Sequence, residues 1–192
     1  MNEKLLRTFL SVPVPGRIKS LKHMFYSSMK DSPGDIKWVR DPQLHLTLSF
    51  LGHTPESTVN TIIESVQQVT RQFEPMELAI NSTGCFPVPT RPRVLWLGVE
   101  GHTLPLISMV NQLRECLDTL GFPSEEREYF PHITLARIRY PQRFTPNIDL
   151  FLQSSYDTIV FPLNRVQFFS SELLPTGAVY TILKTFPLGE SL

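Results

Sequence analysis

Two short stretches decide the fold of this chain: His45-Leu46-Thr47-Leu48 and His132-Ile133-Thr134-Leu135. Both read His-apolar-Thr-Leu, and successive side chains of an extended strand point to opposite faces. Each stretch, taken as a strand, therefore places its histidine and its threonine on one face and its two apolar residues on the other. If the two strands face each other across a cleft, two imidazoles and two hydroxyls converge on one small site.

The composition is that of an ordinary globular protein. The chain has 192 residues, of which 41% are hydrophobic and 19% charged, so one domain or two fused lobes is expected. The formal net charge is zero. This disfavours binding of long nucleic acid through an extended positively charged surface, but it is compatible with a pocket for one phosphate. There is no signal-peptide run and no membrane span of ~18 apolar residues. Cys85 and Cys116 read as free thiols, and we expect a cytoplasmic protein without membrane contact.

Hydrophobic periodicity predicts a mixture of helices and strands. Apolar residues recur at helical spacing over 16–29, 55–73 and 103–120, which predicts amphipathic helices there. Strands are predicted over 7–12, 43–50, 76–83, 94–99, 130–138, 158–169 and 178–186. The elements lack the regular alternation of a parallel sheet, so the pattern favours an α+β fold with antiparallel sheets. One motif strand is followed by a helix and the other is preceded by one, which is compatible with an internal duplication.

Two histidines that face one phosphate suit general acid–base catalysis. The unperturbed pKa of histidine, ~6.5, allows proton uptake and release near neutral pH. A neutral imidazole can accept a proton from a water or hydroxyl, and an imidazolium can protonate a leaving oxygen. A threonine hydroxyl on the same face can donate to a non-bridging phosphate oxygen. One His-x-Thr strand is a weak signal, whereas two copies with matching apolar neighbours are a strong one.

The remaining histidines and the metal-binding alternative carry less weight. His23, His53 and His102 do not repeat the motif context, and we expect them to be structural or solvated. Zinc sites use three or four ligands, and no third ligand stands at a recognisable spacing from the motifs. We therefore expect no metal and no cofactor, and the chain has no Gly-rich phosphate loop.

Two further residues, Phe50 and Arg137, each stand five positions after a motif histidine. A guanidinium binds phosphate in a bidentate fork, and an aromatic ring stacks on a nucleobase. Strict alternation places both side chains on the face opposite their histidine, so they reach the cleft only where a strand ends, bulges or twists. A core position for Phe50 and a surface position for Arg137 therefore stay open. Arg91 and Arg93 either line the cleft mouth or belong to a solvated loop, and Trp96 is expected in the core.

The residues around the motifs resemble the 2H phosphoesterases, and among them the bacterial and archaeal RNA 2′,3′-cyclic phosphodiesterases, also called LigT-type proteins or 2′-5′ RNA ligases. The likeness covers nearly the whole chain. It is carried by residues 7–9, 45–52, 91–98, 130–137 and 171–177, together with Pro13, Trp38 and Tyr180. Gln43 stands where the family often has asparagine, and Ser49 where a longer residue is common.

The resemblance implies a fold and a reaction. The fold is bilobal, with two antiparallel sheets lining a central cleft and helices on the outside, in a single domain over residues 1–192 with two pseudo-symmetric lobes. The reaction is the hydrolysis of RNA 2′,3′-cyclic phosphate ends to 2′-phosphates without metal or ATP, accompanied by weak reverse 2′-5′ ligation. The partner is an RNA end or oligonucleotide that bears the cyclic phosphate, and we expect a monomer.

The resemblance also implies roles by position. His45 would be the proton donor to the departing ribose O3′ and His132 the proton acceptor from the attacking water, although the two roles can be exchanged. Substrate-binding roles fall to Thr47, Thr134, Arg137 and Phe50. The alternatives are a phosphodiesterase for 2′,5′-oligonucleotides or small cyclic nucleotides, and a binding module that recognises RNA ends without turnover.

Overall fold

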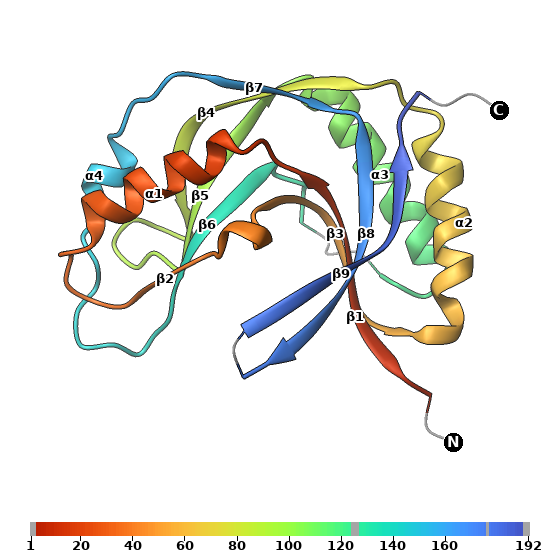
Figure 1. The fold of residues 1–192 in the computed structure, drawn as a ribbon, viewed down its shortest axis with the longest axis horizontal. Coiled ribbons are helices and arrows are strands. Elements are labelled where there is room, and N and C mark those ends of the chain that lie inside the picture. The colour runs from red at the N-terminus through yellow and green to blue at the C-terminus, as the bar shows by residue number, and fades with distance from the viewer. Residues whose placement is uncertain (1–2, 124–126, 176, 190–192) are drawn as a thin grey trace.

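A computed structural model describes residues 3–123, 127–175 and 177–189. Along the chain the described elements are β1 (Leu5–Pro13), α1 (Arg17–Met29), β2 (Ile36–Trp38), the 3₁₀ turn η1 (Asp41–Gln43), β3 (His45–Pro55), η2 (Glu56–Thr58), α2 (Val59–Thr70), β4 (Met76–Phe86), β5 (Val94–Gly101), α3 (Thr103–Thr119), β6 (His132–Ile138), α4 (Asp149–Leu152), β7 (Ile159–Leu163), β8 (Arg165–Leu174) and β9 (Gly177–Pro187). Figure 1 shows α1 and α4 at one side of the strands and α2 and α3 at the other.

The strands form one large antiparallel sheet, which confirms the expected α+β class. Their order is β7-β4-β5-β6-β3-β1-β8-β9, and β2 pairs with β6. The two halves of the sheet meet where β3 pairs with β6, at the single residue pair Leu46 and Ile133. The two sheets expected from the resemblance are therefore continuous through one contact between the motif strands. Both residues of this pair are fully buried.

Both motif strands carry one extra residue at the equivalent position. In β3, Leu10 of β1 pairs with Ser49 and Ser11 pairs with Thr47, so Leu48 has no partner. In β6, Leu95 of β5 pairs with Ala136 and Trp96 pairs with Thr134, so Leu135 is skipped. An extra residue of this kind is a β-bulge, and it reverses the alternation of side chains beyond it.

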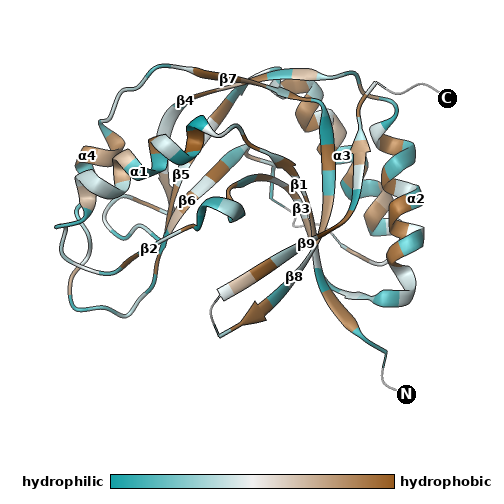
Figure 2. Cartoon of the chain, viewed as in Figure 1, coloured by the Kyte–Doolittle hydropathy of each residue, from teal (hydrophilic) through white to brown (hydrophobic). Residues whose placement is uncertain are grey.

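The helices bury the stripes that the periodicity predicts. In α2 the buried side chains include Ile62, Val66 and Val69, and Figure 2 shows brown and teal alternating along this helix. The helix starts later than predicted, because β3 continues to Pro55, which pairs with Leu5. Among the described residues, no helix has the length and apolarity that a bilayer span requires.

The C-terminal strands differ from the prediction in one respect. The single strand predicted over 158–169 is two strands, β7 and β8, which separate at Asn164. β7 pairs with β4 and β8 pairs with β1, so this short break sends the chain from one edge of the sheet to the other half. The short strand β2 was not predicted, since three residues are too few to show a period.

Gly84 of β4 provides a test of the packing around Trp96. A Cβ at this position would lie 2.2 Å from the ring of Trp96, its cross-strand partner. We expect Gly84→Ala to lower the free energy of unfolding by about 1–3 kcal/mol, the usual cost of overpacking, as measured by chemical denaturation. Gly16→Ala is the matched control, because a Cβ there meets nothing within 4 Å. Equal stability of the two variants would contradict the packing.

Candidate active site

The two motif histidines have the same hydrogen bond. Nδ1 of His45 lies 2.6 Å from the carbonyl oxygen of Gln43, and Nδ1 of His132 lies 2.8 Å from the carbonyl oxygen of Phe130. A carbonyl oxygen only accepts, so each Nδ1 carries a proton and donates it. This fixes the neutral tautomer in which Nε2 holds the lone pair. Each histidine therefore presents Nε2 as the group that can exchange a proton with a ligand.

The pKa of both imidazoles is lowered. Burial is the main cause for each, because a charged imidazolium is poorly solvated inside the protein. The positive charge of Arg137 lowers the pKa of both His45 and His132, and the charge of Arg127 adds to the effect at His132. The carbonyl hydrogen bonds act in the opposite direction and only partly offset these effects. Arg137 is therefore placed where its field reaches both histidines.

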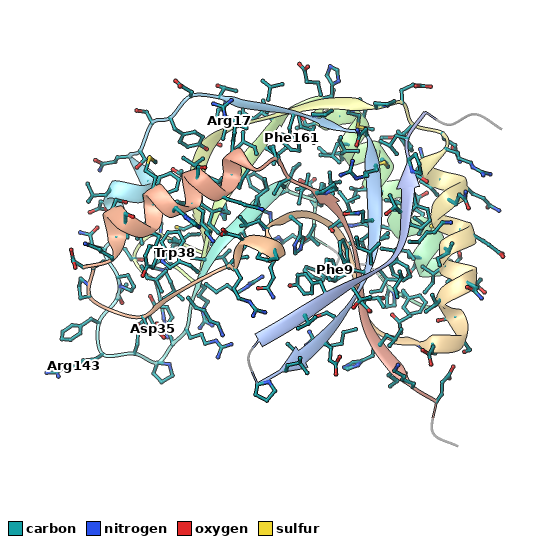
Figure 3. All side chains as sticks on the ribbon, in the orientation of Figure 1. Phe9, Arg17, Asp35, Trp38, Arg143 and Phe161 are labelled. Carbon is teal, nitrogen blue, oxygen red and sulfur yellow. The ribbon has the colours of Figure 1, made fainter. Side chains whose placement is uncertain are left out.

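Aromatic rings enclose His45 on the half of the sheet that contains β1, β8 and β9. The ring of Phe9 stacks on the imidazole with centroids 5.0 Å apart, and Tyr180 of β9 meets its edge at 5.7 Å. Phe169 of β8 stacks on Phe9 at 5.3 Å and lies tilted to Tyr180 at 6.2 Å. Figure 3 shows Phe9 where β1 and β3 pass beside the β8–β9 hairpin. The rings limit the orientations that the imidazole can adopt.

A second group of rings encloses His132. Phe86 lies edge-on to the imidazole at 5.2 Å, Phe130 stacks at 6.1 Å, and Trp96 lies at 6.4 Å. The prediction that Trp96 belongs to the core is wrong. Its neighbours Leu95 and Leu97 are fully buried, so alternation along β5 turns Trp96 to the opposite face, beside His132.

The two β-bulges resolve the positions of Phe50 and Arg137. The side chain of Phe50 is 59% exposed and its ring lies 6.0 Å from that of Phe9, which stacks on His45. Arg137 is exposed and acts on both histidines. Both residues thus lie on the same face as their histidines, and the core position for Phe50 is wrong. Strict alternation fails because the extra residue at Leu48 or Leu135 turns the following side chains over.

The threonines complete the same face. The antiparallel pairing of Leu46 with Ile133 places His45 level with Thr134 and Thr47 level with His132. Within the part of the chain that the structure describes, neither threonine hydroxyl has a protein hydrogen-bond partner, whereas the backbone carbonyl of Thr47 accepts a hydrogen bond of 2.8 Å from the Tyr129 hydroxyl. The two hydroxyls are therefore available to an external acceptor.

Gln43 connects His45 to the β8–β9 hairpin. Sequence reasoning did not identify this connection. Its carbonyl holds the imidazole, while its side-chain amide donates to the carbonyl oxygen of Ala178 at the start of β9. Asp41 of the same 3₁₀ turn forms an ion pair with the buried ammonium of Lys22 on α1, and this hydrogen-bonded ammonium lowers the pKa of Asp41. The turn that precedes His45 is thus anchored at both ends. The only local signal was the position of Gln43 two residues before the motif.

The residues outside the motifs lie in other settings. His23 contacts Asp41 at 3.1 Å, and Nδ1 of His102 accepts from the backbone N–H of Glu77. The guanidiniums of Arg91 and Arg93 lie over the ring of Tyr140, at 5.2 and 5.9 Å from its centroid. No cluster of three or more His, Cys, Asp or Glu side chains that could hold a metal ion is present among the described residues.

The chain is similar to several known proteins. A curated RNA 2′,3′-cyclic phosphodiesterase of Thermotoga maritima is 31% identical over 179 residues, which cover 93% of each chain. One of Methanothermobacter thermautotrophicus is 30% identical over 188 residues, 95% of this chain and 99% of the relative. A crystal structure from Thermus thermophilus, 29% identical, matches with a TM-score of 0.79 over 95% of this chain and 98% of that chain.

The family comparison finds the duplicated pattern. The family described as LigT-like phosphoesterase matches residues 13–96 and again residues 97–180. Each match contains one His-x-Thr strand, a β-bulge three residues after the motif histidine, and a motif histidine held through Nδ1. The two matches together span most of the chain, and we conclude that this chain belongs to the LigT-like phosphoesterase family.

Proposed function

We propose that this protein hydrolyses RNA 2′,3′-cyclic phosphate ends to 2′-phosphates by two-histidine general acid–base catalysis. One observation carries the proposal: two imidazoles on one face, each with Nδ1 bonded to a carbonyl and Nε2 left for proton transfer. Curated relatives that bear the name RNA 2′,3′-cyclic phosphodiesterase support the choice of substrate. The reaction is a displacement at phosphorus, which needs a base on one side and an acid on the other.

In the proposed mechanism His132 acts as the base. Its Nε2 removes a proton from water while the water oxygen attacks phosphorus. The bond from phosphorus to O3′ breaks, and the imidazolium of His45 protonates the departing O3′ to leave a 2′-phosphate. The negative phosphate raises the pKa of a nearby imidazole, which offsets the lowering at His45 and favours the protonated acid when substrate is bound.

The substrate-binding roles rest on the same face of the sheet. We assign phosphate oxygens to the hydroxyls of Thr47 and Thr134 and to the guanidinium of Arg137, whose charge acts on both histidines. The exposed ring of Phe50 is assigned to the terminal base. Lys37 of β2 pairs directly with Arg137 across the strands, and two adjacent cations suit an anionic ligand.

The remaining features of the proposal concern the protein as a whole. Both histidines come from one chain, which supports a monomeric enzyme, and the repeated strand, bulge and histidine bond support one domain of two pseudo-symmetric lobes. The free thiols of Cys85 and Cys116 suit a reducing compartment, and we propose the cytoplasm. The proton transfers need no metal ion.

The direct test uses a short RNA that ends in a 2′,3′-cyclic phosphate, in excess EDTA. We expect a 2′-phosphate product, and we expect His45→Ala and His132→Ala each to lower the rate by about 10²-fold or more, as loss of a general acid or base does. His53→Ala, an exposed histidine on β3, is the matched control. RNA binding without product would favour the binding module, and activity only after added metal would overturn the two-histidine mechanism.

The pH profile tests the lowered pKa values. The acid must be protonated, and a lowered pKa means that it loses its proton at a lower pH than an ordinary histidine. We therefore expect kcat/KM to fall with rising pH through a value below the usual ~6.5 of histidine. Arg137→Gln should move this limb to higher pH while slowing the reaction, because a cation beside both imidazoles is lost. NMR titration of the imidazoles supplies the independent check, and a limb above ~6.5 in the wild type would contradict the burial effect.

Gln43→Ala tests the link between His45 and the hairpin. The variant keeps the carbonyl that holds Nδ1 but loses the amide that binds Ala178. We expect kcat to fall about tenfold with KM little changed, because a small misplacement of a catalytic group slows the chemical step. Gln167→Ala is the control, since its amide also bridges β8 and β9, to Thr185, away from His45. Equal kcat values for the two variants would refute a positioning role for Gln43.

A further inference from the structure

A tyrosine side chain links the two motif strands at a second point, beside their backbone contact. In the described structure the backbone pairing between β3 and β6 is confined to one residue pair. Near it, the hydroxyl of Tyr129 donates a hydrogen bond of 2.8 Å to the carbonyl oxygen of Thr47. Tyr129 lies three residues before His132, and Thr47 lies two residues after His45. One hydrogen bond therefore joins the segment that leads into the second motif to the middle of the first.

Tyr129 stands directly before the carbonyl that holds His132. That carbonyl belongs to Phe130 and accepts the proton of the imidazole Nδ1. The carbonyl of the next residue, Pro131, accepts a hydrogen bond of 3.2 Å from the backbone N–H of Val99 on β5. The support of His132 is thus attached to its own half of the sheet through Pro131, and to the other half through Tyr129.

The ring of Tyr129 is held from α3. The guanidinium of Arg114 lies over this ring, 5.6 Å from its centroid, and its Nη1 donates to the carbonyl oxygen of Arg127 at 3.1 Å. The tyrosine packs against the hydrophobic core, and burial raises the pKa of its hydroxyl. The hydroxyl therefore keeps its proton around neutral pH and remains a donor to Thr47.

A cavity beside this bond shows that close packing does not by itself fix the distance between the segment and β3. The cavity has a volume of about 100 Å³, and its lining includes Thr47, Tyr129 and His132. A single water needs only roughly 10–15 Å³, so the walls leave space between them. Where side chains do not fill the space between two elements, directed bonds determine their separation. The bond from Tyr129 to Thr47 supplies such a constraint.

We propose that Tyr129 is a positioning residue, whose hydroxyl sets the location of His132 relative to Thr47. This role rests on the proposed function, in which His132 removes a proton from water and Thr47 binds the phosphate that the water attacks. A displacement of about 1 Å between such groups costs up to about 10²-fold in rate. Tyr129 itself takes no part in the proton transfers, because its own proton is bonded to the carbonyl.

The test compares Tyr129→Phe with Tyr156→Phe in the hydrolysis of a short RNA that ends in a 2′,3′-cyclic phosphate. Tyr156 is the matched control, because its hydroxyl donates to the carbonyl of Ser82 on β4 at 2.9 Å, away from both motifs. Both substitutions keep the ring and delete one bond between a tyrosine and a strand carbonyl. We expect kcat to fall about tenfold in Tyr129→Phe with KM little changed, and both constants to stay near the wild-type values in Tyr156→Phe.

Two readouts separate positioning from a loss of stability. Chemical denaturation should show a similar loss for the two variants, since each leaves one strand carbonyl without its tyrosine donor. The pH profile of kcat/KM should keep its falling limb at the wild-type pH in Tyr129→Phe, while the rate drops at every pH. The substitution replaces a neutral side chain by another, so a moved limb would contradict a role that acts through position alone.

Arg114→Met approaches the same bond from a different element. The variant removes the guanidinium over the tyrosine ring, and we expect a smaller loss of kcat than in Tyr129→Phe. In the Tyr129→Phe background it should cause little further loss, because two changes that act through one bond are not additive. Losses that multiply in the double variant would contradict a support that acts through Tyr129. This variant also guards against a folding defect of Tyr129→Phe.

The outcomes separate this inference from the proposed function. Equal kcat values in Tyr129→Phe and Tyr156→Phe overturn the positioning role, while hydrolysis by the wild type leaves the proposed function standing. A higher KM with unchanged kcat in Tyr129→Phe also overturns it, because this pattern reports lost substrate binding rather than a misplaced base. No hydrolysis by the wild type overturns the proposed function and the positioning role with it.

Discussion

The pairing of Leu46 with Ile133 is the contact on which the rest of the site depends. It is the one residue pair recorded between β3 and β6 in the described structure, and both side chains are fully buried. Each of these residues directly follows a motif histidine, so the antiparallel contact brings the two His-x-Thr segments level with each other. The side chains of Leu46 and Ile133 are buried on one face of this strand pair. The two histidines and the two threonines lie on the opposite face.

The two β-bulges extend this arrangement beyond the histidines. In a strand with strict alternation, only every second side chain would lie on the face of the histidines. The fifth residue after each histidine would then point to the opposite, buried face. The extra residue at Leu48 and at Leu135 turns the chain over, so Phe50 and Arg137 join the face of the histidines. The aromatic ring and the guanidinium occupy equivalent positions in the two halves. The two halves therefore share the backbone irregularity, while the side chains at this position differ.

The electrostatics of the face explain how a chain of zero net charge could form the phosphate site proposed above. Arg137 of β6 stands directly opposite Lys37 of β2, an arrangement of like charges that disfavours folding by itself. Its charge also lowers the pKa of both histidines. In the proposed mechanism, a bound phosphate would relieve the repulsion between the cations and raise the pKa of the imidazoles, so ligand binding and the protonation of the proposed acid would reinforce each other.

The sequence by itself determined the α+β class, the amphipathic helices, the two His-x-Thr strands and the likeness to the family. Each of these follows from local hydrophobic periodicity or from a short motif. Only the tertiary structure decided where Phe50, Trp96 and Arg137 face, how Gln43 reaches Ala178, and that a cavity lies beside His132. These features depend on the register between strands that are far apart in the chain. A β-bulge is defined by the pairing with a partner strand. No local sequence pattern indicates which residue will be left without a partner.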